Sequence, residues 1–129
     1  MILKSIHLKN FRKFKDSYLD FPDGVTGVVG LNGVGKSTLF EAVAWTLYGP
    51  VAARTATDQI KREGAAPSDP CLVELDFIFN DDTYHVVREM SGKNLSASGS
   101  ATVNGKLAAN GAEVLSKFIQ KRLGMDWKS

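Results

Sequence analysis

The chain has 129 residues, enough for one compact domain, and its 43% hydrophobic and 23% charged residues are those of an ordinary globular protein. With a single cysteine, the chain cannot form an internal disulfide. The sequence also lacks the cluster of cysteines and histidines that would indicate a zinc site. No apolar run is long enough to span a bilayer, and a net charge of +2 is too small to indicate a nucleic-acid partner by itself. We therefore expect a cytoplasmic, intracellular protein without a membrane partner.

Strands are predicted at residues 2–10, 17–21 and 25–30, ahead of a glycine-rich stretch. In the first strand Ile2, Ile6 and Leu8 share one parity, which indicates one covered face. The sequence Pro22-Asp23-Gly24 predicts a tight turn between the second and third strands. The third strand is almost entirely apolar, as in strands that are covered on both faces.

Residues 30–37 match the phosphate-loop pattern G-x-x-x-x-G-K-[ST], with an apolar strand before them and a helical pattern after them. Glycines let the backbone N–H groups point at phosphate oxygens, and the N-terminus of the following helix adds partial positive charge. Lys36 is placed to bridge the β- and γ-phosphates, Ser37 to bind Mg²⁺ and Thr38 to contact the α-phosphate. The motif therefore predicts ATP and Mg²⁺ as ligands.

A helix is predicted directly after this loop, because Leu39, Val43 and Leu47 recur at helical spacing. Gly49-Pro50 ends it, since glycine tolerates a left-handed backbone and proline cannot continue a helix. Residues 50–70 then form a long connection with little periodicity. Connections of this length in a small domain are usually functional or mobile.

Residues 71–109 are predicted to form an antiparallel subsheet of consecutive hairpins. Within residues 71–79, Glu74 and Asp76 alternate with apolar side chains and therefore face the opposite side of the sheet. Asn104-Gly105 is a strong signal for a two-residue hairpin turn.

The last predicted element is a helix at residues 110–124. Asn110 and Glu113 have the spacing of a capping box, with Asn110 as the N-cap, and Gly124 ends the helix. Its predicted apolar stripe comprises Val114, Leu115, Phe118, Ile119 and Leu123.

Phosphate binding alone is not hydrolysis, which also needs an acidic Mg²⁺ partner and a group that positions the attacking water. Asp76 is a candidate for that partner, but the alternation around Glu74 indicates a half-exposed strand rather than a buried acidic one. Residues 95–99 are similar to the signature loop of ABC transporters, yet they lead into a hairpin rather than a helix. We therefore expect an incomplete active site.

Several segments together resemble the N-terminal lobe of an SMC-like ATPase head of the ABC type. They are LKNFRKF (8–14), DFPDGVTGVVG (20–30), LNGVGKSTLFEAVAWTLYG (31–49), IKREG (60–64) and the hairpin VELDF…YHVVRE (73–89). The sequence is most similar to the double-strand-break repair ATPases, the large subunit of SbcCD-type nuclease complexes. The resemblance covers essentially all 129 residues.

This resemblance implies an α/β P-loop NTPase lobe with a mixed sheet, an antiparallel subsheet and two main helices. It implies that Arg12 lies near the nucleotide phosphates and that IKREG, with Arg62, lies near the adenine. It also implies ATP and Mg²⁺ as ligands, with Ser37 on the metal. The residues that it places on the phosphates are Asn32, Gly33, Val34, Gly35, Lys36, Ser37 and Thr38.

The resemblance further implies partners: the C-terminal lobe of the same head, a second head in an ATP-sandwiched dimer, a partner nuclease, and DNA bound without sequence preference. The acidic strand, the signature loop and the catalytic glutamate and histidine of such heads belong to the C-terminal lobe. We therefore expect a nucleoid-associated fragment that binds ATP without efficient hydrolysis. Candidate DNA contacts are Lys13, Lys15, Lys117, Lys121 and Arg122.

Two alternatives stay open. The chain could belong to another branch of SMC-like or RecF-like DNA repair or chromosome-condensation ATPases. It could also be a small P-loop phosphotransferase in which Asp76 and Ser37 hold Mg²⁺ and residues 50–70 form a lid.

Overall fold

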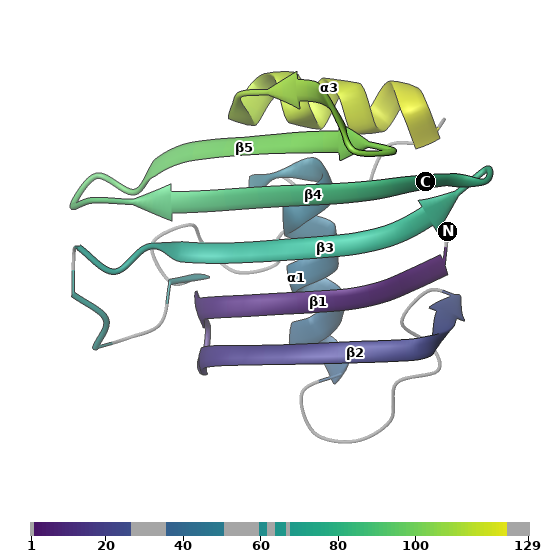
Figure 1. The fold of residues 1–129 in the computed structure, drawn as a ribbon. Helices are drawn as coiled ribbons and strands as arrows, with labels where there is room; N and C mark the ends of the chain where they lie inside the picture. The colour runs from purple at the N-terminus through teal and green to yellow at the C-terminus, as the bar shows by residue number, and fades with distance from the viewer. Residues whose placement is uncertain (1, 27–35, 51–59, 62–63, 67, 124–129) are drawn as a thin grey trace.

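A computed structural model describes residues 2–26, 36–50, 60–61, 64–66 and 68–123. These residues form a six-stranded sheet with the order β2-β1-β3-β4-β5-β6, together with two main helices (Figure 1). The elements are β1 (Ile2–Phe11), β2 (Phe14–Thr26), α1 (Lys36–Tyr48), β3 (Cys71–Phe79), β4 (Asp82–Ser91), β5 (Ser96–Val103), β6 (Lys106–Asn110) and α3 (Ala112–Leu123). The predicted α/β class, with a sheet and two main helices, is confirmed.

Each described strand pairs antiparallel with its neighbours. Short turns connect β1 to β2, β3 to β4, β4 to β5 and β5 to β6, whereas β1 and β3 are far apart in the sequence. Asn104 and Gly105 have positive φ angles of 52° and 84°, as a type I′ hairpin turn requires, so this prediction is confirmed. Asn80 and Asp81, with φ of 51° and 67°, form the same kind of turn between β3 and β4. Since β1 pairs with both β2 and β3, the strands before and after the phosphate loop belong to one sheet.

The first residues of β1 differ from the predicted alternation. Leu3 is buried and Ile2 is 41% exposed, the reverse of the expected pattern at this end, whereas Ile6 and Leu8 are buried as predicted. The pairing register shifts between Leu3 and Ser5 against both neighbouring strands. An extra residue in a strand moves the side chains on one side of it to the opposite face, which accounts for the exposed Ile2.

The predicted tight turn at Pro22-Asp23-Gly24 is wrong, because β2 continues through these residues. Ser5 pairs with Asp20 and Leu3 pairs with Val25, so β2 absorbs the intervening residues as an irregularity instead of reversing direction. The remainder of the apolar strand predicted after this turn lies outside the described residues.

The hydrophobic core lies between the sheet and the helices. In Figure 1, α1 passes behind the sheet and crosses its strands, and α3 lies beside β5 and β6. Trp45 of α1 is fully buried, and its ring lies 5.6 Å from that of Phe11 at the end of β1. The inward side chains of β3 are buried as the alternation predicts: Cys71, Val73, Leu75 and Phe77.

A glycine ends α1. Gly49, with φ of 88°, ends α1 as predicted, and its N–H donates to the Trp45 carbonyl over 2.8 Å. No helix among the described residues is long and apolar enough to cross a membrane.

The predicted N-cap of the last helix is wrong, because Asn110 is the final residue of β6. Gly111, with φ of 119°, takes the N-cap position, and its carbonyl accepts the first helical hydrogen bond from the Leu115 N–H at 2.8 Å. Val114 is 53% exposed and does not belong to the apolar face. The residues of α3 that do face the core are Leu115, Ile119 and Leu123, with Phe118 partly buried.

Candidate nucleotide-binding site

The phosphate-loop sequence leads directly into α1, which begins at Lys36. No acidic residue lies in the first turn of α1, so no carboxylate of that turn opposes the partial positive charge of the helix N-terminus. The first N–H groups of such a helix have no partner within the helix and suit phosphate oxygens. The structure describes only the backbone of Lys36, Ser37 and Thr38, and leaves outside its described residues Asn32, Gly33, Val34, Gly35 and Arg62.

Arg12 lies in the tight turn between β1 and β2 and has a left-handed φ of 53°. Its backbone N–H donates to the Ile60 carbonyl over 2.6 Å, and the preceding Phe11 forms a β-bridge with Lys61. A left-handed backbone is uncommon for a residue other than glycine, and here these pairings hold it in place. The structure therefore brings the NFR segment against the start of the IKREG segment.

The side chain of Arg12 reaches α1. Its Nη1 lies 3.3 Å from Oε1 of Glu41, and the two side chains are 34% and 8% exposed. A buried carboxylate needs a cationic or hydrogen-bonding partner, and Arg12 supplies one. The guanidinium is thereby held beside the first two turns of the helix that follows the phosphate loop.

Sequence reasoning identified Arg12 but missed Glu41. Glu41 is the only acidic residue of α1, and its neighbours Ala42 and Val43 are buried. A carboxylate within an otherwise apolar helical stretch is the signal that could have found it, because such a group requires a partner.

The family comparison gives a direct match. A family model described as an AAA domain matches residues 5–128 of the chain. The chain belongs to this AAA domain family. It therefore shares the fold of a P-loop ATPase domain.

Curated relatives extend over almost the whole AAA domain. A DNA double-strand break repair Rad50 ATPase from Methanococcus maripaludis is 33% identical over 126 residues, which cover 98% of this chain and 12% of that protein. Its counterpart from Methanocaldococcus jannaschii is 35% identical over 128 residues, with the same coverage. A chromosome partition protein Smc from Fusobacterium nucleatum is 36% identical over 90 residues, 65% of this chain and 8% of its own length. The chain thus spans only about 12% of the length of these Rad50 relatives.

A solved structure of the recombination mediator protein RecF matches the fold with a TM-score of 0.53 and 24% identity. The match covers 82% of this chain and 27% of RecF. Together with the Rad50 and Smc relatives, it confirms the resemblance to the N-terminal lobe of an SMC-like ATPase.

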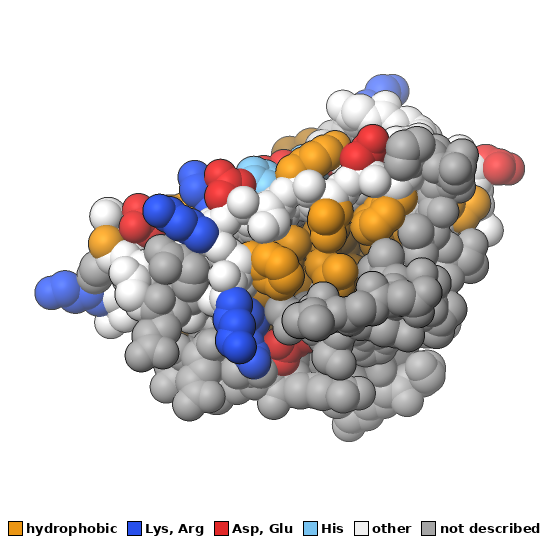
Figure 2. All heavy atoms as spheres, turned by 90° about the horizontal axis from the view of Figure 1, so that it is seen from below, with side chains coloured by type: hydrophobic (Ala, Val, Ile, Leu, Met, Phe, Trp, Pro, Cys, Tyr) orange, Lys and Arg blue, Asp and Glu red, His pale blue; other side chains and the backbone are white. Residues whose placement is uncertain are grey.

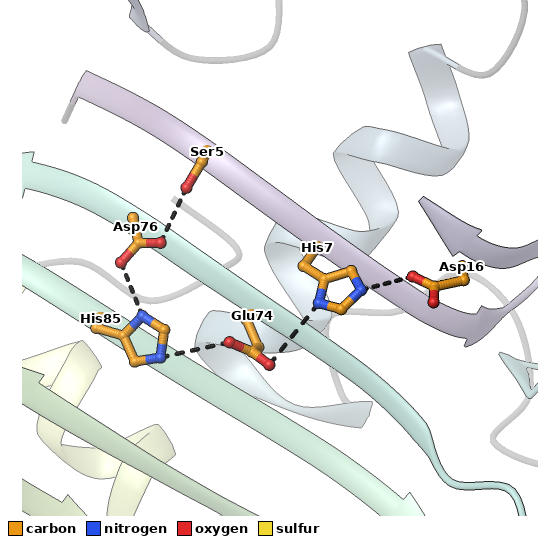
Figure 3. A network of polar contacts seen from close by, with 6 residues as sticks. All are labelled: Ser5, His7, Asp16, Glu74, Asp76 and His85. Carbon is orange, nitrogen blue, oxygen red and sulfur yellow. Dashed lines mark hydrogen bonds and ion pairs between the residues drawn. The ribbon is translucent and has the colours of Figure 1, made fainter. Parts of the chain in front are cut away.

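Asp76 lies on the face of the sheet that points away from α1 (Figure 3). Its two flanking side chains, Leu75 and Phe77, are fully buried on the side of α1, so alternation directs Asp76 to the opposite side. Its Oδ2 accepts a hydrogen bond from Ser5 Oγ over 2.9 Å, and its Oδ1 lies 2.7 Å from Nδ1 of His85. Asp76 therefore does not reach the start of α1, which argues against a phosphotransferase in which it shares Mg²⁺ with Ser37.

The contacts of Asp76 continue as a chain of polar side chains across the sheet (Figure 3). Glu74 lies 3.6 Å from Nε2 of His85 and 3.8 Å from Nδ1 of His7, whose Nε2 lies 2.7 Å from Asp16. Among the described residues, no group of histidine, cysteine and carboxylate side chains has an arrangement that could hold a metal ion. These side chains are partners of one another on the face of the sheet that points away from α1.

The candidate DNA-contacting residues do not form one surface. Lys13 and Lys15 lie at the β1–β2 turn and on β2, at one edge of the sheet, whereas the others lie on α3, which packs on β5 and β6 at the other edge. On α3, Arg122 donates to the hydroxyl of Tyr84 over 3.0 Å. The α3 group comprises Lys117, Lys121 and Arg122, all exposed.

Proposed function

We propose that this chain is the ATP-binding N-terminal half of the head of an SMC-like DNA double-strand-break repair ATPase. The observation that carries the proposal is the position of Arg12, whose guanidinium lies beside the first two turns of α1 immediately after a complete phosphate-loop sequence. A cation and an unopposed helix N-terminus at one place suit a triphosphate. The similarity to Rad50 ATPases over 98% of the chain supports the same assignment.

In this proposal different side chains contact different phosphates of ATP. Lys36 bridges the β- and γ-phosphates, Thr38 contacts the α-phosphate, and Arg12 adds positive charge beside them. Ser37 holds Mg²⁺, and the bound metal ion neutralises charge on the phosphate oxygens. Arg62 lies near the adenine. The backbone N–H groups of Asn32, Gly33, Val34 and Gly35 surround the phosphates.

Efficient hydrolysis requires an acidic metal partner and a group that positions water, and these come from elsewhere in our proposal. Glu41, the only carboxylate of α1, is engaged with Arg12. We assign the missing groups to the C-terminal lobe of the same head and the last γ-phosphate contacts to a second head. Hydrophobic side chains gathered on the face seen from the β2 side support a further lobe on this side (Figure 2).

In the intact protein, ATP binding would close a dimer of heads, and hydrolysis would reopen it and regulate a partner nuclease on DNA ends. DNA contact would be independent of sequence, through exposed lysine and arginine side chains, and therefore steeply dependent on salt. Such a protein works inside the cell on the nucleoid.

A head from another SMC-like or RecF-like branch is the second candidate. The similarity to the Smc protein of Fusobacterium nucleatum and the fold match to RecF favour it. The reading frame after Ser129 separates the branches: several hundred residues of heptad repeats favour the nuclease-associated or chromosome-condensing branches over the RecF type.

Equilibrium binding of ATP–Mg²⁺ to the purified chain tests the proposed function. We expect measurable binding by the wild type and at least about tenfold weaker binding by Lys36→Ala, because a charge-assisted contact to phosphate is lost. Lys117→Ala, which removes an exposed lysine of α3, is the matched control and should bind like the wild type. Equal affinities of the wild type and Lys36→Ala would contradict the proposal.

A further inference from the structure

Arg88 is a fully enclosed cation in the middle of the molecule. It lies in β4 between Val86 and Met90 on the inward parity of that strand, and only 2% of it is exposed. Burial lowers the pKa of Arg88 to about 10, so the side chain still carries its charge at neutral pH. A buried charge is costly and calls for a specific set of partners.

The guanidinium of Arg88 joins three elements. Its Nε donates to the Thr46 carbonyl of α1 over 3.0 Å, and its Nη1 donates to the Ala112 carbonyl of α3 over 3.3 Å. Its Nη2 donates to Ser116 Oγ of α3 over 2.8 Å, and that hydroxyl in turn donates to the Tyr48 carbonyl of α1 over 3.1 Å. One planar group therefore holds the last turn of α1 and the first turns of α3.

These partners suit a cation without a counter-ion. Among the described residues, no carboxylate forms an ion pair with Arg88. The carbonyls of the last turn of a helix lack partners within the helix and carry its partial negative charge. Arg88 and Ser116 supply hydrogen bonds to two of these carbonyls, so the C-terminal end of α1 is closed by residues of β4 and α3.

Gly49, directly after α1, packs closely against this contact. A Cβ atom on Gly49 would lie 3.2 Å from Nη1 of Arg88 and 3.2 Å from Oγ of Ser116. The φ of 88° at Gly49 also disfavours any other residue. Glycine at this position thus leaves room for the guanidinium as well as ending α1.

We propose that Arg88 is a positioning residue that couples α1 to α3, so that triphosphate binding at the start of α1 slows the opening of α3. The inference rests on the nucleotide-binding function proposed above. α1 is a helix of 13 residues, about 20 Å long, which follows the phosphate-loop sequence at one end and meets the Arg88 contact at the other. When bound phosphate stabilises the first turn of α1, the hydrogen bonds of Arg88 and Ser116 transmit this stabilisation to α3.

Amide hydrogen exchange of the purified chain, with and without ATP–Mg²⁺, tests this coupling. In the wild type, nucleotide should slow exchange within α3 by about fivefold or more, the lower end of typical coupling between sites. Arg88→Lys keeps the charge but loses the planar fork that reaches both helices. It should bind nucleotide with an affinity close to that of the wild type, yet show no nucleotide effect in α3.

Arg122→Lys is the matched control, because Arg122 also connects α3 to β4, through Tyr84 and Asp82, and among the described residues none of its hydrogen bonds or ion pairs reaches α1. It should retain the response of α3. If thermal unfolding shows that Arg88→Lys does not fold, Ser116→Ala takes its place, since it removes the hydroxyl that bridges Arg88 and the Tyr48 carbonyl.

The outcomes separate the two proposals. Nucleotide binding without an effect in wild-type α3, or an effect retained in Arg88→Lys, overturns the coupling and leaves the nucleotide site standing. Absence of nucleotide binding by the wild type overturns the proposed function, and the coupling with it.

Discussion

Cys71 begins β3 and is fully buried, as expected for a small core residue in an apolar run. Burial raises the pKa of its thiol from 9.0 to about 12, although the positive charge of Lys61 acts in the opposite direction. At pH 8 only about one thiol in ten thousand is then ionised, and the thiolate is the reactive form. A thiol reagent should therefore label Cys71 slowly in the native protein and rapidly in urea; fast labelling of the native protein would contradict the buried position.

The same thiol makes stability depend on pH in the alkaline range. Because the folded pKa of Cys71 lies above its ordinary value of 9.0, the unfolded chain loses the proton first as the pH rises. The free energy of unfolding should fall from about pH 9 upward, by roughly 1 kcal/mol per pH unit from this group. Comparing the wild type with Cys71→Ala in urea at pH 8 and pH 10 isolates this contribution. A constant difference between the two proteins would contradict it.

Arg12 and Lys13 are neighbouring cations that the structure treats differently. Arg12 contacts Glu41 of α1, whereas Lys13 is exposed in the turn. Arg12→Ala should weaken ATP–Mg²⁺ binding by about tenfold, because it removes a charge-assisted contact near the phosphates. Lys13→Ala should leave the affinity unchanged at moderate salt, and calorimetric titration of both variants checks this. Equal losses would indicate a general charge effect instead.

At the residue scale, the sequence singled out Arg12 as a candidate site residue but did not predict its contact with Glu41. The pattern NFR identified Arg12 through a family resemblance, but the pairing with Glu41 depends on how β1 and α1 pack, which local patterns do not contain. Arg88 is similar: its inward parity in β4 was readable, since Tyr84, Val86 and Met90 share it. Its partners on two helices were not readable, because they come from distant parts of the chain.

At the element scale, turns with their own chemistry were predictable. Asn104-Gly105 favours positive φ at both positions, which fixes a two-residue turn without help from the rest of the fold. Pro22-Asp23-Gly24 has equally strong local preferences, yet it lies within β2, because the pairs with β1 on either side of it keep the strand running in one direction. The shift of register near Leu3 likewise arises from pairing with neighbouring strands and was not visible in the sequence.

The start of α3 provides a test at this scale. Gly111 is the N-cap with φ of 119°, whereas Asn110 is an exposed residue of β6. Gly111→Ala should destabilise the protein by about 1–3 kcal/mol, since other residues are strained at this φ. Asn110→Ala should change the free energy of unfolding in urea by less than about 0.5 kcal/mol, as for an ordinary surface substitution. A larger loss of stability for Asn110→Ala than for Gly111→Ala would contradict this and favour Asn110 as the N-cap.

At the scale of the whole molecule, the two faces of the sheet have different roles. One face carries the core and both helices, with the start of α1 and Arg12 on the side of β2 and the Arg88 contact on the side of α3. The other face carries the polar chain from Asp16 to Asp76 (Figure 3). The site that we propose for the triphosphate is therefore remote from Asp76. Alternation along the strands predicts which side chains share a face of the sheet. It does not predict which face α1 covers, because that depends on how the whole chain folds.

Phosphate release and nucleotide binding, measured on one preparation of the purified chain with ATP–Mg²⁺, test the half-site most directly. We expect bound ATP to be detectable in the wild type and reduced in Lys36→Ala, while phosphate release by the wild type stays at the level of that variant. Turnover in the range typical of enzymes, about 1 per second or faster, that Lys36→Ala abolishes would show that the chain carries a complete active site. That result would contradict the assignment of hydrolysis to a second lobe.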